Sequence, residues 1–126
     1  MKNIILNLGD ANIKKFYYGY VEIVISPMYK LRKREEEILA LLLYYNNMKK
    51  HIEEEDRLKI VFNINTRKKI CEELGVTNNI IQQILNTLRK KGLIKGIKFN
   101  KSIEIYCEEG DVIIGFKMNI KDDKPN

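Results

Sequence analysis

The sequence predicts an α+β domain with three main helices and a small antiparallel sheet. A long segment, residues 28–50, carries apolar residues at helical spacing. A second segment, residues 66–92, carries two shorter apolar stripes that are separated by a glycine. Apolar and polar residues then alternate over residues 93–107, which is typical of a pair of strands.

Composition and charge indicate a globular protein with a polyanionic partner. The chain has 126 residues, of which 44% are hydrophobic and 32% charged, as expected for one globular domain. The net charge of +6 favours polyanionic partners. This charge is concentrated, because residues 66–101 contain nine basic residues and only two acidic ones. Such a basic segment is the footprint that phosphate binding requires.

The sequence argues against a metal, a cofactor, a membrane span and a catalytic centre. Cys71 and Cys107 are far apart and His51 is the only histidine, whereas structural zinc needs about four ligands. We expect two reduced thiols and no long apolar segment that could enter a membrane. There is no glycine-rich phosphate loop, and no nucleophile stands beside a base. The sequence therefore predicts a cytoplasmic protein that is not an enzyme and has no evident small-molecule ligand.

The first 27 residues are predicted to contribute strands that pack on the domain or extend its sheet. Residues 16–25 are rich in Tyr, Val and Ile and alternate in polarity towards their end, which favours a strand. Both faces of this strand would be apolar. It would therefore either pack on the chain's own helices or meet a second subunit, and the sequence leaves these two alternatives open.

Ser26 and Pro27 are predicted to begin the long helix, since a hydroxyl caps a helix and proline suits its first turn. The helix should continue to about Lys50. Its expected core stripe is apolar at helical spacing and consists of Leu31, Ile38, Leu41, Leu42, Tyr45 and Met48. Leu39 and Leu43 extend the apolar surface, so we expect this helix to be central. Residues 57–63 alternate and are predicted to form a short strand.

Residues 66–92 are predicted to form two helices that are joined by a tight turn. Thr66 would cap the first helix and Gly75 would end it. Val76 would fill the gap between the helices, and Thr77 would help to cap the second. The buried stripes at helical spacing are expected to be Ile70, Cys71 and Leu74 in the first helix, and Ile81, Ile84, Leu85 and Leu88 in the second.

This helix, glycine turn, valine and capped second helix resemble the helix-turn-helix family. A hairpin is predicted after Gly92, with its turn at residues 99–102 and its return strand at residues 103–107. With it, the resemblance extends to the winged-helix proteins. The resemblance covers about residues 28–107. Residues 112–120 are rich in Val and Ile and are predicted to form a last strand beyond the wing, so the domain is expected to span residues 28–120, with a loose polar tail at residues 121–126.

In that family the second helix enters the major groove of DNA. Asn and Gln can pair with adenine edges there, and Arg can pair with guanine. The predicted base contacts lie on the outward face of this helix and are Asn79, Gln82, Gln83, Asn86 and Arg89. The predicted phosphate contacts are the basic and polar residues around both helices and the hairpin, namely Thr66, Arg67, Lys68, Lys69, Thr77, Asn78, Lys90, Lys91, Lys98, Asn100 and Lys101.

The sequence thus predicts a sequence-specific double-stranded DNA-binding protein of bacterial or bacteriophage type that regulates transcription. It would be associated with the nucleoid in a bacterium or lie in the host cytoplasm for a phage. Two alternatives stay open: a plasmid or phage replication-initiation protein, and a winged-helix assembly module without specific DNA binding. Whether the chain forms a homodimer is also left open.

Overall fold

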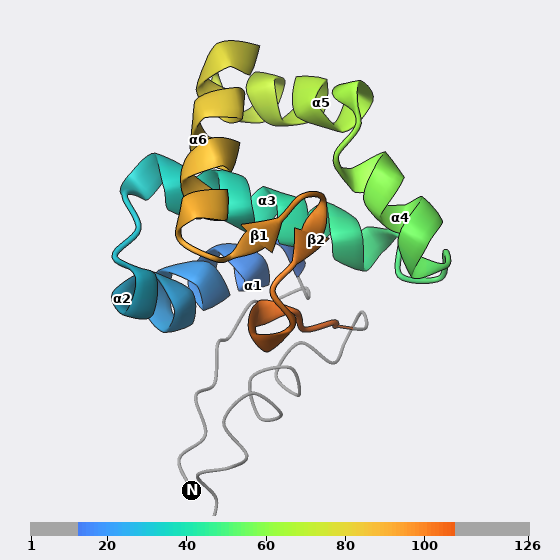
Figure 1. Ribbon diagram of the computed structural model, residues 1–126, viewed down its shortest axis with the longest axis horizontal. Coiled ribbons are helices and arrows are strands. Elements are labelled where there is room, and N and C mark those ends of the chain that lie inside the picture. The colour runs from blue at the N-terminus through green and yellow to red at the C-terminus, as the bar shows by residue number, and fades with distance from the viewer. Residues whose placement is uncertain (1–12, 108–126) are drawn as a thin grey trace, which may run out of the picture.

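The computed structural model describes residues 13–107 of the chain, which are mostly helical (Figure 1). The helical elements are α1 (Ile13–Tyr20), the π-helical η1 (Val21–Ile25), α2 (Ser26–Tyr29), α3 (Lys33–Met48), α4 (Glu54–Val61), α5 (Ile64–Leu74) and α6 (Asn78–Lys90). They are followed by the antiparallel strands β1 (Ile94–Lys95) and β2 (Lys98–Phe99) and the 3-10 helix η2 (Lys101–Ile103). The described residues are therefore compatible with an α+β class.

Helix α3 is the central element, as predicted. In Figure 1 it lies between α1 on one side and α5 and the start of α6 on the other, with α4 near its C-terminal end. Every residue from Ile38 to Leu43 is at most 1% exposed. Burying such aliphatic side chains stabilises a fold by about 1.5–3 kcal/mol each. Met48 was wrongly predicted to join this core, because it lies in the last turn and is 51% exposed.

The predicted strand at residues 16–25 is wrong, because α1, η1 and α2 form one nearly continuous helical segment. Tyr17, Tyr20 and Val21 are at most 1% exposed and recur at the spacing of a helix rather than a strand. Packing against α3 thus overrides the strand preference of tyrosine and valine. The predicted strand at residues 112–120 and the tail at 121–126 lie outside the described residues.

The long helix begins later than predicted. Ser26 and Pro27 begin only the short α2, which ends at Lys30 in a left-handed conformation with φ +56°. Helix α3 starts after Arg32, whose backbone N–H donates to Oε1 of Glu35 at 3.0 Å. The sequence predicted one helix starting at Ser26, whereas the structure has two helices, α2 and α3, that are separated by residues 30–32.

The predicted strand at residues 57–63 is also wrong, because most of it belongs to α4. The first turn of α4 is acidic, and carboxylates stabilise the positive end of a helix dipole. Arg57, Leu58 and Val61 are buried at helical spacing. The apolar residues that alternated in the sequence therefore belong to the buried face of a short helix.

The predicted return strand at residues 103–107 is wrong, because Ile103 ends η2 and residues 104–107 have no regular secondary structure; side chains of the helices hold this segment instead. The Tyr17 hydroxyl donates to the Ile105 carbonyl at 2.7 Å, and the Tyr20 hydroxyl donates to the Ile103 carbonyl at 2.8 Å. The Cys107 N–H donates to Oδ1 of Asn47 at 2.8 Å. In the described chain this segment pairs with no strand, so side chains supply the partners that its backbone needs.

Alkaline pH should destabilise the fold through Tyr17. Burial raises the pKa of Tyr17 above its ordinary value. Below about pH 10 both states carry a neutral phenol, whereas above it the unfolded state ionises first, so stability falls by up to about 1.4 kcal/mol per pH unit for this residue. Tyr17→Phe should reduce the slope of stability above pH 10, as measured by urea unfolding. At neutral pH it should cost about 1–3 kcal/mol, because the Ile105 carbonyl loses its donor. An unchanged alkaline slope would contradict this assignment.

Candidate nucleic-acid interface

Helix α5 starts one turn earlier than its predicted cap. Asn63 is the N-cap, and its Oδ1 accepts from the Thr66 N–H at 2.9 Å. Thr66 is 7% exposed and its hydroxyl donates to the Ile60 carbonyl at 2.7 Å. The prediction of Thr66 as the cap was wrong, because its hydroxyl donates to the carbonyl of Ile60 near the end of α4 and Asn63 caps the helix instead. The Thr66 hydroxyl is therefore not presented to a ligand.

The turn between α5 and α6 has the predicted chemistry. Gly75 ends α5 in the left-handed conformation with φ +68°, and its N–H donates to the Cys71 carbonyl at 2.8 Å. Thr77 caps α6, since its hydroxyl oxygen accepts from the Ile80 N–H at 3.3 Å. Val76 packs against the core in the turn. The two predicted helices and their glycine turn are confirmed as secondary structure.

Helix α6 has a sharply divided surface. Ile81, Leu85 and Leu88 are at most 1% exposed, and Ile84 is half-buried, so the predicted inward stripe is confirmed. Apart from Ile80, which is 37% exposed, the exposed residues of α6 are polar or basic: Asn78, Asn79, Gln83, Asn86 and Lys90. No residue of α6 is acidic. This face therefore offers hydrogen-bonding groups to a ligand without repelling an anion.

Three predicted base contacts form a hydrogen-bonded row along one flank of α6. In this row, hereafter the α6 row, Arg89 Nη1 donates to Oδ1 of Asn86 at 3.3 Å, and Nε2 of Gln82 donates to the same oxygen at 3.4 Å. Arg89 Nε also donates to the Gly96 carbonyl at 3.1 Å. The row thus joins α6 to the hairpin. Asn79 and Gln83 lie on the exposed side of α6 and make no such link.

The hairpin is shorter than predicted and turns earlier. Ile94 pairs with Phe99 and Lys95 with Lys98, so the turn is Gly96–Ile97 rather than residues 99–102. Gly96 has φ +64°, a conformation that favours glycine. The predicted turn was wrong because Phe99 is buried, with its ring 5.5 Å from that of Phe62.

The residue after β2 has a structural role. Asn100 Nδ2 donates to the Gly92 carbonyl at 3.0 Å, and Asn100 Oδ1 accepts from the Ser102 N–H at 2.9 Å. Its side chain therefore ties the end of α6 to η2. Asn100 is half-buried, and both ends of its amide are already occupied.

The predicted phosphate contacts fall into two groups. The exposed ones are Lys68, Lys69, Thr77, Asn78, Lys90 and Lys98. Among these, Lys69 lies over the Tyr45 ring at 5.8 Å. In the second group Lys91 Nζ is engaged by the Lys30 carbonyl at 2.9 Å and by Glu35 at 3.2 Å. Lys101 Nζ lies 3.3 Å from a carboxylate oxygen of Glu54, but the side chain of Lys101 is 77% exposed. Such an exposed ion pair is weak, so another anion could replace Glu54 as the partner of Lys101.

Arg67 is a predicted phosphate contact with a buried donor that the described residues leave unsatisfied. Its Nε is buried and has no hydrogen-bond partner within residues 13–107. A buried donor without an acceptor costs about 1–3 kcal/mol, and more when it is charged. Because this Nε is itself buried, a phosphate could contact only the outer nitrogens of the half-buried side chain. The sequence identified Arg67 as a basic residue but gave no sign that its guanidinium lacked a partner.

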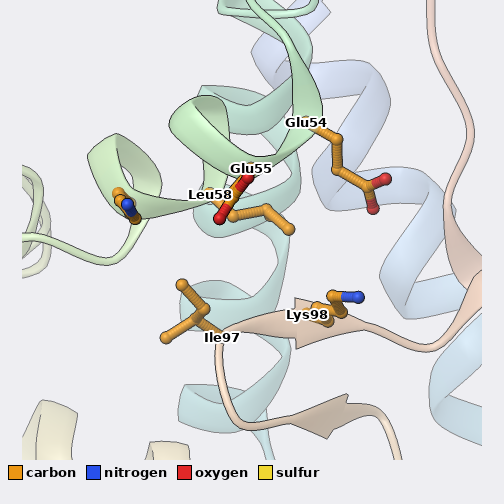
Figure 2. Close-up of a pocket in the computed structure, with 6 residues that line it drawn as sticks. Glu54, Glu55, Leu58, Ile97 and Lys98 are labelled. Atoms are coloured by element: carbon orange, nitrogen blue, oxygen red, sulfur yellow. The ribbon is translucent and has the colours of Figure 1, made fainter.

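The basic surface is bounded at the hairpin by a hollow of mixed charge. This hollow has a volume of about 380 Å³. It lies between α4 and the hairpin, with Leu58 and Ile97 on its apolar sides (Figure 2). Glu54 and Glu55 project from α4 on one side, and Lys98 projects from β2 on the other. Carboxylates at this rim would repel a phosphate chain. The surface suited to a polyanion therefore ends at the hairpin and does not extend over α4.

Comparisons with known proteins give no family for this chain. No family model, no curated protein and no solved structure matches it. Residues 13–107 contain no group of three or more His, Cys, Asp or Glu residues that could hold a metal ion. None of the helices in this range is long and apolar enough to cross a membrane. Cys71 is half-buried and Cys107 buried, and both are free thiols.

The two faces of α6 should respond differently to one added charge. Leu85→Asp should destabilise the protein by several kcal/mol, because its carboxylate would be buried without a partner. Gln83→Asp is the matched control, since it places the same group on the exposed side of the same helix. Thermal unfolding measured by circular dichroism should show a large loss for the first variant only. Equal melting curves would refute the division of α6 into a buried and an exposed face.

Proposed function

We propose that this chain is a winged-helix protein that binds double-stranded DNA in a sequence-specific way and regulates transcription in the cytoplasm. The observation that carries the proposal is the exposed face of α6, which presents amides and Lys90 without a single carboxylate. An α-helix with its side chains is about 10–12 Å across and the major groove is about 12 Å wide, so α6 is of a size to enter it.

In this proposal, amides of α6 contact base edges and cations of neighbouring elements contact the backbone. Asn79 and Gln83 are exposed and not tied to the hairpin, so they are suited to base contacts. Arg67, Lys68 and Lys98 are the proposed phosphate contacts from α5 and β2. Thr66 is left out of this set because its hydroxyl is buried and engaged.

The charge balance around α5 supports the same proposal. Glu73, one of the two acidic residues of α5, pairs with Lys14 of α1 at 2.9 Å. This pair also raises the pKa of the Lys14 ammonium through its hydrogen bond to Glu73. The carboxylate of Glu73 is therefore screened by a cation from outside the basic segment. The positive charge of Arg67 and Lys68 is left available to a polyanion.

The direct test is selection from a random pool of duplex DNA at low and at moderate salt. We expect enrichment of a short site that persists at moderate salt, and a palindromic site would indicate binding as a homodimer. Binding at low salt only, without enrichment, would reduce the protein to a nonspecific polycation. Absence of binding at both salt concentrations would overturn the proposal in favour of an assembly module.

Replacing one proposed phosphate contact should weaken binding to all sequences alike. Lys68→Ala removes an exposed cation of α5, so the slope of log affinity against log salt should become shallower by about 1. Lys49→Ala is the control, because Lys49 is an exposed lysine that lies just after the C-terminal end of α3. Titration of the selected duplex at several salt concentrations gives both slopes. If both variants have the slope of the original protein, Lys68 is not a phosphate contact.

A further inference from the structure

We propose that Arg89 is a positioning residue that fixes the hydrogen-bond polarity of the α6 row. As a result, Asn86 presents its amino group to DNA but not its carbonyl oxygen, and Gln82 presents its carbonyl oxygen beside the one remaining N–H of its amide. This inference rests on the proposed function and adds to it which base edges the two amides accept. It differs from the expectation that Arg89 contacts guanine and that each amide pairs with adenine.

The first step is that the chemistry of arginine decides the orientation of Asn86. A guanidinium can only donate hydrogen bonds, whereas the two ends of an amide differ only in donating or accepting. The Asn86 atom that faces Arg89 Nη1 at 3.3 Å must therefore be Oδ1. The opposite orientation would place two donors against each other.

The second step is that the orientation of Asn86 decides the orientation of the Gln82 amide. Because Oδ1 of Asn86 is an acceptor, the Gln82 atom 3.4 Å from it must be Nε2. One donor-only residue at the end of the row therefore orients both amides. Without Arg89, each amide would be free to rotate by half a turn and to offer either end to a ligand.

The third step is that Arg89 is itself held in place. Its Nε donates to the Gly96 carbonyl at 3.1 Å while Nη1 donates to Asn86. Two of its nitrogen atoms are thus engaged on different elements, and the side chain is half-buried. These two bonds use only two of the five N–H donors of the guanidinium, and they hold the side chain along α6 towards the hairpin. The observed contacts of Arg89 thus assign it a positioning role, and direct contact with a guanine through Nη1 and Nη2 is the competing outcome that the experiment below distinguishes.

The remaining groups define a pattern of base preference. Within residues 13–107, neither Nδ2 of Asn86 nor Oε1 of Gln82 has a hydrogen-bond partner. In the major groove a donor is accepted by guanine, adenine and thymine but not by cytosine. An acceptor is accepted by the amino groups of adenine and cytosine. Residues four apart are separated by about 6 Å along the helix axis, so the contacts of Gln82 and Asn86 would fall within about two base pairs of each other.

Site selection with Arg89 variants tests this inference. Arg89→Met removes every donor while keeping an unbranched apolar stem, and it should abolish the exclusion of cytosine at one position of the site. Preferences at the positions contacted by Asn79 and Gln83 should persist. Arg89→Lys keeps a cationic group that can only donate hydrogen bonds, and it should restore the exclusion at least in part. Lys90→Met is the control, because it removes the adjacent exposed cation and should lower affinity without changing any base preference.

Asn86→Asp provides a second test that does not depend on how well Arg89→Met folds. The new carboxylate keeps its partner Arg89 but has no amino group. The preference at the same position should therefore change from excluding cytosine to favouring cytosine or adenine. Circular dichroism should show an unchanged fold.

The outcomes separate the inference from the proposed function. If the unaltered protein enriches no site, the proposed function fails and the inference fails with it. If it enriches a site, but Arg89→Met and Asn86→Asp leave every base preference as it was, only the inference fails. A loss confined to guanine at one position in Arg89→Met would instead assign Arg89 to direct contact with a base.

Discussion

Burial of α3 on all sides is the constraint on which the rest of the structure depends. A helix whose residues 38–43 are all at most 1% exposed has no face that can be left in water. Helix α1 covers one side, while α5 and α6 cover another. Helices α5 and α6, which carry the candidate interface, thus pack against the apolar surface of α3. Their positions are set by core packing, which leaves the outer face of α6 free for polar residues.

The second constraint is the hydrogen bonding of the chain after the hairpin. Ile103, at the end of η2, and Cys107 are buried against the core, yet no strand of the described chain pairs with the segment between them. Hydroxyl groups of Tyr17 and Tyr20 and the amide of Asn47 take the place of a neighbouring strand. Arg57 and Asn46 both donate to the Tyr106 hydroxyl, at 3.1 and 3.2 Å. The two bonds from α1 give Tyr17 and Tyr20 a role that valine or leucine at the same buried positions could not fill.

The parts of the fold that sequence patterns predicted well are those governed by local rules. The stripe of Ile81, Leu85 and Leu88 and the left-handed Gly75 depend only on helix period and glycine geometry. Strand predictions failed where packing overrode propensity, as at residues 16–25. The hairpin turn was misplaced because the contact of Phe99 with Phe62 joins residues far apart in the sequence. No local pattern encodes such a contact.

The same distinction holds for the candidate site. The outward face of α6 follows from its period, so the sequence placed Asn79, Gln83 and Asn86 on it. The engagement of Lys91 by Glu35 and of Arg89 by Gly96 depends on how separate elements meet. The sequence therefore predicted which side chains are polar and basic there, but not which of them are already occupied. That difference separates residues suited to contact a ligand from residues that position others.

The contact between Arg89 and Gly96 also joins the stability of the hairpin to its proposed use. Strands of two residues are too short to be stable alone. The hairpin is held by the burial of Phe99, by the Asn100 N–H donating to the Leu93 carbonyl at 2.8 Å, and by Arg89. Any displacement of the Gly96–Ile97 turn would release Arg89 and, with it, the orientation of Asn86. In the proposed function, a backbone contact made by Lys98 would therefore bear on which bases α6 accepts. Hairpin and helix would then act as one recognition unit rather than as two independent contacts.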